Sequence, residues 1–122
     1  MIDTEVKVIN LLETTLNELV DDRIFRLTVP DAYADKYPYI RVSEINNIND
    51  DYRDNKAKAS DIRVQIDFWT KGDPAPIQNL INKTMESHQF KRTGVTPFYE
   101  EDTGAFRKAM RYISKANLKE ET

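Results

Sequence analysis

The residues able to carry out chemistry are few, and their spacing matches no familiar catalytic or metal-binding pattern. The chain has one histidine, His88, and no cysteine, so a thiolate nucleophile is excluded and a zinc site is not expected. Glu100, Glu101 and Asp102 could form a carboxylate pair for acid–base catalysis, but adjacent acidic residues beside a turn are more typical of an exposed surface. The aspartates between residues 50 and 61 lack the central glycine of an EF-hand calcium loop. We therefore expect no catalytic residues, no bound metal and no cofactor.

Two sets of residues are candidates for contact with a partner. Asp67 and Trp69 lie on the polar side of an alternating segment, so this pair either docks a partner or covers a small second cluster. The basic run Arg107, Lys108 and Arg111 could face a polyanion such as DNA. The same run could instead belong to a charged edge strand that discourages aggregation. Both interpretations stay open for each set.

The elements that must position these residues follow from the apolar periodicity. Residues 61–69 alternate without a break, which predicts a strand with one core face and one wetter face that carries Asp67 and Trp69. The predicted core face holds Ile62, Val64, Ile66 and Phe68. Amphipathic helices are predicted over Thr4–Val20 and Ala75–His88. The apolar stripe of the first helix comprises Val6, Ile9, Leu12, Leu16 and Leu19, with Val8, Leu11 and Val20 beside them. Four more strands are predicted at Ile24–Val29, Tyr39–Ile45, Phe90–Tyr99 and Ala105–Ser114.

The order of these elements predicts an α+β fold. Helix, three strands, helix and two strands follow one another, and short connections favour antiparallel neighbours. We expect a mostly antiparallel sheet of four to five strands with two helices packed on one face. Residues 1–114 are expected to form a single domain, and residues 115–122 a polar tail.

A highly charged segment, residues 46–60, separates the second and third predicted strands. Its acidic and basic residues balance, and it has only two isolated apolar side chains, so it cannot bury enough surface to offset the entropy of ordering. We predict a mobile charged loop at this place. Its candidates for subunit contact are Tyr52, Arg53, Lys56 and Lys58.

Length and composition argue against further classes of protein. The 122 residues carry a formal net charge of −3, which does not indicate a dedicated nucleic-acid binder. No apolar run approaches the ~20 residues that a membrane helix needs, and no signal peptide opens the chain. We therefore expect a soluble protein that is not exported.

An ordered set of short segments resembles a known family. After the first helix come Arg23-Ile24-Phe25, then Tyr37-Pro38-Tyr39-Ile40, then the central strand from Val64 to Trp69. A second helix follows, and the turn Tyr99–Gly104 leads into the last strand. Taken in this order, from about Val6 to Ser114, they resemble the tail-terminator proteins of long-tailed bacteriophages and prophages, which are also called tail-completion or head–tail joining proteins.

The resemblance implies a structural protein of the virion. Such a protein caps the head-proximal end of the tail tube as a hexameric ring and stops the polymerisation of the major tail-tube protein. It offers a docking surface to the head connector or stopper protein, and double-stranded DNA passes through its lumen without being read. The free subunit would be a monomer or already a ring, present in the host cytoplasm during assembly and in the virion afterwards. The family has no catalytic residues to transfer to this sequence.

Other functions remain open on the sequence alone. Within the same class, the chain could be another head–tail connector component, namely an adaptor or a stopper. In a different class, it could be a small nucleic-acid-binding module that uses the basic last strand. A third alternative is a small enzyme with an acidic site at residues 100–102.

Overall fold

The computed structural model describes residues 4–45 and 62–114, and within them the predicted α+β fold is confirmed. Two helices and five strands follow in the predicted order, with a short 3-10 helix, η1 (Asp31–Tyr33), after the first strand. The bounds of the other elements are α1 Thr4–Val20, β1 Ile24–Arg26, β2 Tyr39–Glu44, β3 Ile62–Thr70, α3 Ala75–Ser87, β4 Phe90–Glu100 and β5 Ala105–Ser114.

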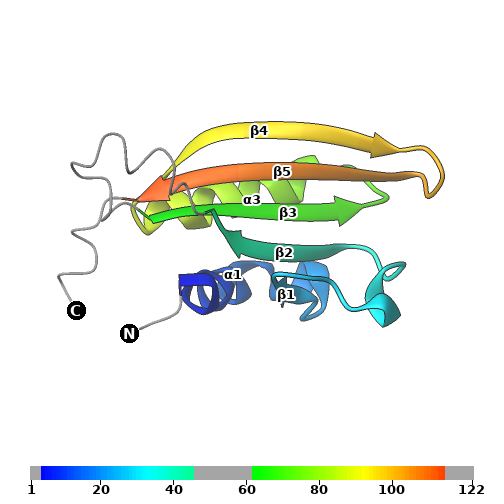
Figure 1. Ribbon diagram of the computed structural model, residues 1–122, viewed down its shortest axis with the longest axis horizontal. Coiled ribbons are helices and arrows are strands. Elements are labelled where there is room, and N and C mark those ends of the chain that lie inside the picture. The colour runs from blue at the N-terminus through cyan, green and yellow to red at the C-terminus, as the bar shows by residue number, and fades with distance from the viewer. Residues whose placement is uncertain (1–3, 46–61, 115–122) are drawn as a thin grey trace.

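The five strands form one sheet in the order β1-β2-β3-β5-β4 (Figure 1). Strand β3 lies in the middle and pairs antiparallel with both β2 and β5. After β3 the chain passes through α3 and enters β4, which is the edge strand. Strand β5 then runs antiparallel to β4 and lies between β4 and β3. The last strand is therefore an interior strand, and its basic residues are not those of a sheet edge.

The first strand departs from the prediction. Strand β1 has three residues instead of the six expected, because the chain turns away at Leu27, where φ is 69°. It pairs parallel with β2, as Ile24 lies beside Ile40. A parallel neighbour needs a crossover of about a dozen residues, and residues 27–38 with η1 supply one.

Both helices pack on the same face of the sheet, as predicted. The buried core joins the two helices to every second residue of the strands, including Ile40 and Val42 in β2, Val64, Ile66 and Phe68 in β3, and Met110 and Tyr112 in β5. Figure 1 looks onto the opposite face, with α3 behind β3 and β5. We call the face away from the helices the open face.

The apolar stripe predicted for α1 is rotated from the one observed. The buried residues are Glu5, Val8, Leu12, Leu16 and Val20. By contrast, Val6 and Leu19 are 43% and 41% exposed. A polar contact explains the rotation: Glu5 forms a 2.9 Å ion pair with Arg26 and accepts a 2.8 Å hydrogen bond from the backbone N–H of Glu44. These contacts hold the first turn of the helix against the β1–β2 edge.

Candidate functional site

The open face carries a cluster of charged and aromatic side chains at its centre, which we call the open-face cluster: Tyr39, Arg41, Asp67, Trp69 and Arg107. Strand register assembles it. Arg41 lies opposite Asp67, and Trp69 is flanked by Tyr39 on one side and Arg107 on the other. The other neighbour of Asp67 is the small Ala109, which leaves room for the guanidinium of Arg107 to reach Asp67 diagonally.

Asp67 is fully buried, which corrects the prediction that it lies on a wet surface. Both carboxylate oxygens are engaged. One accepts from Arg41 Nη2, and the other lies 2.9 Å from Gln65 Nε2 and 3.5 Å from Arg107 Nη2. A carboxylate out of water needs such charge-assisted partners, because its desolvation is costly when they are missing. The two arginines cover Asp67 and keep about a quarter of their own side-chain surface exposed.

Trp69 is also buried, with 9% of its surface exposed, and this too differs from the wet position expected. The guanidinium carbons of Arg41 and Arg107 lie 5.2 Å and 5.4 Å from its ring centroid, within cation–π range. Tyr39 stacks on it at 5.0 Å, and its indole N–H donates to the carboxylate of Glu100 at 3.4 Å. The sequence left two interpretations of Trp69, and the structure supports the one in which this residue covers a second cluster. That it also contacts a partner stays a prediction.

Aromatic rings extend this cluster toward one end of the sheet. Tyr37 stacks on Tyr39 at 5.4 Å, and Phe25 contacts both Tyr39 and Tyr33. The Tyr39 hydroxyl donates a 2.9 Å hydrogen bond to the backbone oxygen of Ala34. Burial, with added repulsion from neighbouring acidic groups, raises the pKa of Tyr39 to about 12. The cluster is thus a packed unit, separate from the core beneath the helices.

The structure does not bring the basic run of β5 together. Successive strand residues point to opposite faces, so Lys108 lies on the helix side while Arg107 and Arg111 lie on the open face. Arg107 is paired with Asp67. Arg111 is exposed and donates to neutral oxygens of Gln65 (3.2 Å) and Thr96 (3.4 Å). A continuous cationic stripe of these three residues is therefore absent.

The remaining candidates from the sequence show no catalytic arrangement. His88 is exposed after α3, with its Nδ1 3.0 Å from the backbone oxygen of Thr84. Glu101 and Asp102 are exposed in the predicted turn, and Glu100 reaches the indole of Trp69. Within residues 4–45 and 62–114, no group of three or more His, Cys, Asp or Glu side chains could hold a metal ion. None of the helices in these ranges has the length and apolar character needed to cross a membrane.

Several predicted contact residues cannot be placed. Tyr52, Arg53, Lys56 and Lys58, with the whole predicted loop 46–60, lie outside the described residues, as does the predicted tail 115–122. Conversely, sequence reasoning missed Tyr39 and Arg41 as members of the open-face cluster, and Glu100 as the acceptor of the Trp69 indole N–H. The alternation of Tyr39 and Arg41 with the buried Ile40 and Val42 was the signal that could have assigned the first two to a polar sheet face.

Comparison with known proteins gives no assignment. No protein-family model matches the chain, and a search of curated proteins finds no match either.

Proposed function

We propose that this chain is a tail terminator of a long-tailed phage or prophage. In this role it is a non-enzymatic subunit that assembles as a ring on the head-proximal end of the tail tube, stops tube growth and presents a docking surface to the head connector. The ring is hexameric and lets double-stranded DNA pass. The protein is present in the host cytoplasm during assembly and in the virion tail afterwards.

One observation carries the proposal: the segments that bear the family resemblance meet in space. They lie far apart in the chain, at residues 23–25, 37–40, 64–69 and 99–104. The ring centroids of Phe25 and Tyr39 are 6.5 Å apart, and those of Tyr39 and Trp69 are 5.0 Å apart. The indole N–H of Trp69 in turn donates a 3.4 Å hydrogen bond to the carboxylate of Glu100. The resemblance therefore rests on one connected cluster across four strands, instead of on unrelated matches along the sequence.

The layering of the fold also supports a ring subunit. A closed ring of identical subunits needs head-to-tail contacts between two different surface patches. With both helices on one face, the chain offers two chemically distinct faces, one helical and one made of the open sheet.

A tube-length assay tests the proposal. The gene would be deleted from its phage or prophage, and tail lengths measured by electron microscopy with and without the wild-type chain supplied from a plasmid. We expect tails of irregular, often excessive length in the deletion, and a uniform length with labelled protein at one tube end after complementation. Unchanged tail lengths in the deletion would refute the terminator role.

The same assay separates the alternatives. An adaptor or stopper would leave tail length uniform in the deletion but would block the joining of heads to tails. A nucleic-acid-binding module is not favoured by the open face, because Arg107 is engaged with Asp67 and the Trp69 ring is covered by two guanidiniums. The Trp69 ring is therefore not free to stack on a base, as the aromatic rings of such modules do.

A further inference from the structure

The two ends of the β4–β5 hairpin differ in chemistry. At one end is the turn, residues 98–106, which has three acidic residues and no basic one; we call it the acidic tip. Glu101 and Asp102 are exposed there, and Glu100 is held by Trp69. Figure 1 shows this turn projecting past the end of β3.

The acidic tip also exposes aromatic rings. Phe98, Tyr99 and Phe106 are 42%, 56% and 37% exposed, and they make up three of the seven large hydrophobic residues exposed in the described part of the chain. Tyr99 and Phe106 contact each other at 5.0 Å on the helix side of the hairpin. Phe98 lies on the open face against the guanidinium of Arg107, at 4.7 Å. Exposed aromatic rings that protrude in this way are typical anchors of protein interfaces.

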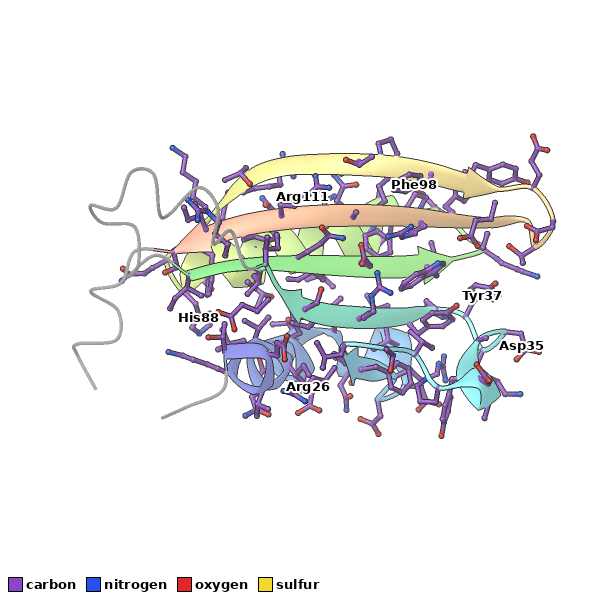
Figure 2. The ribbon with its side chains drawn as sticks, viewed as in Figure 1. Arg26, Asp35, Tyr37, His88, Phe98 and Arg111 are labelled. Carbon is purple, nitrogen blue, oxygen red and sulfur yellow. The ribbon has the colours of Figure 1, made fainter. Side chains whose placement is uncertain are left out.

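The opposite end of the open face is basic. Strand register places Arg63 and Lys91 on either side of Ile113, and Arg111 one row further along between Gln65 and Gly94. We call Arg63, Lys91 and Arg111 the basic end. Ile113 is half-buried between Arg63 and Lys91, and Gly94, which has no side chain, lies beside Arg111. These two residues form a low, apolar floor in this region. Along β5, eight residues separate Ala105 in the acidic tip from Ile113 in this region, which corresponds to about 26 Å at ~3.3 Å per residue. Figure 2 shows Arg111 and Phe98 displaced in this way along the hairpin.

We propose that the acidic tip of one copy of this chain docks on the basic end of the next copy. This inference deepens the proposed function and rests on it, since it names the contact that closes the ring. Exposed carboxylates at the tip would meet Arg63, Lys91 and Arg111, while the aromatic rings would cover the floor at Ile113 and Gly94. The contact joins two different patches at opposite ends of the same hairpin. It is therefore heterologous, as a ring requires.

Charge reversal gives a sharp test. The tip variant carries Glu101→Lys and Asp102→Lys, and the basic-end variant carries Lys91→Glu and Arg111→Glu. Association of each full chain would be measured by sedimentation and native mass spectrometry, alone and with purified tail tubes. We expect each variant alone to associate at least about tenfold more weakly than wild type, because like charges then face each other.

Mixing the two variants distinguishes the proposed contact from general damage. In a 1:1 mixture, the lysines of each reversed tip meet the glutamates of a reversed basic end, and each native tip meets a native basic end. An even-numbered ring of alternating copies can therefore close, and we expect the mixture to regain association near the wild-type level. Glu13→Lys with Glu18→Lys on the exposed side of α1 is the matched control, which should associate like wild type.

The aromatic part is tested separately with Tyr99→Ser. Tyr99 is more than half exposed, so the fold should keep its thermal midpoint while association weakens. Because the charges are intact in this variant, loss of association here would assign a role to the ring itself.

The outcomes separate the contact from the proposed function. Suppose that the wild-type chain forms rings. Normal association of both reversal variants, or failure of their mixture to recover, would then overturn the contact and leave the terminator role standing. The basic-end variant could instead lose salt-dependent binding to a DNA duplex while its association stays unchanged. That result would also overturn the contact, since the basic end would then bind a polyanion. Recovery in the mixture together with uncapped tubes would support the contact and refute the terminator role. No association of the wild-type chain under any condition would overturn both.

Discussion

Replacing Asp67 by asparagine tests the reasoning about the open-face cluster most directly. The carboxylate is fully buried and is contacted by Arg41, Arg107 and Gln65. Asparagine has nearly the same shape but no charge, and its amide NH2 would have to face donors. The change therefore leaves two guanidiniums on the sheet without their counter-ion, at a place where water reaches them only in part.

The expected loss follows from these contacts. Hydrogen bonds to charged groups contribute about 1.5–3 kcal/mol each, and breaking a buried pair typically costs about 3–5 kcal/mol. Because the Arg41 and Arg107 side chains are 27% and 26% exposed, water can solvate part of their charge after the change. We expect the free energy of unfolding to fall by about 2–4 kcal/mol in Asp67→Asn.

Urea unfolding gives the measurement. Trp69 is the sole tryptophan and has both guanidinium carbons within 5.4 Å of its ring centroid, so its fluorescence reports on the cluster. Far-UV circular dichroism serves as a second probe. The control is Asp35→Asn, an exposed aspartate in the η1–β2 connection, which should stay within about 0.5 kcal/mol of wild type. An Asp67→Asn protein as stable as this control would refute the view that the carboxylate holds the two arginines.

A triple replacement separates charge pairing from packing. Arg41→Met, Asp67→Leu and Arg107→Met together remove the whole ionic group and keep similar volume. Buried ion pairs replaced by apolar groups are often neutral or stabilising, so we expect the triple variant to be more stable than Asp67→Asn alone. A triple variant that unfolds as readily as Asp67→Asn would show that side-chain shape, instead of charge, is what the cluster requires.

Three further predictions concern the turn, the aromatic cluster and α1. Gln89 has a φ of 72°, a conformation that glycine adopts without strain. Gln89→Gly should therefore raise the free energy of unfolding by about 0.5–1 kcal/mol, whereas Ser87→Gly at the last residue of α3 should lower it. Thermal melting of both variants checks these expectations. The pKa of Tyr39 is raised to about 12 in the fold, so the unfolded chain loses this proton near pH 10 while the folded chain keeps it. The contribution of Tyr39 to stability is thus full below pH 10 and is lost as the pH rises toward 12. In urea titrations between pH 10 and 12, the free energy of unfolding should therefore decline less steeply for Tyr39→Phe than for wild type. Leu16→Ala should cost about 2–5 kcal/mol in urea unfolding and Leu19→Ala under about 1 kcal/mol, and equal losses would contradict the observed rotation of α1.

The sequence predicted the elements well where the signal is local. The bounds of α1 and β5 match the prediction, and α3 ends one residue before it, because periodicity and turn residues act over a few neighbours. The alternation over residues 61–69 likewise assigned Asp67 and Trp69 to the correct face of β3. Among the bounds of the strands and helices in the described residues, only those of β1 were clearly misjudged, since its extent depends on where the chain leaves the sheet edge.

Tertiary structure decided the sheet order and the character of the site. Nothing local indicates that β5 lies between β3 and β4, yet this placement puts Arg107 beside Trp69. The burial of Asp67 likewise depends on Arg41 and Arg107, which lie 26 and 40 residues away along the chain. A polar residue on a sheet face is wet or dry according to its cross-strand neighbours, and register, which is set only when the strands pair, chooses those neighbours. The alternating sequence thus fixed which way each side chain of β3 points, and the fold determined what it meets there.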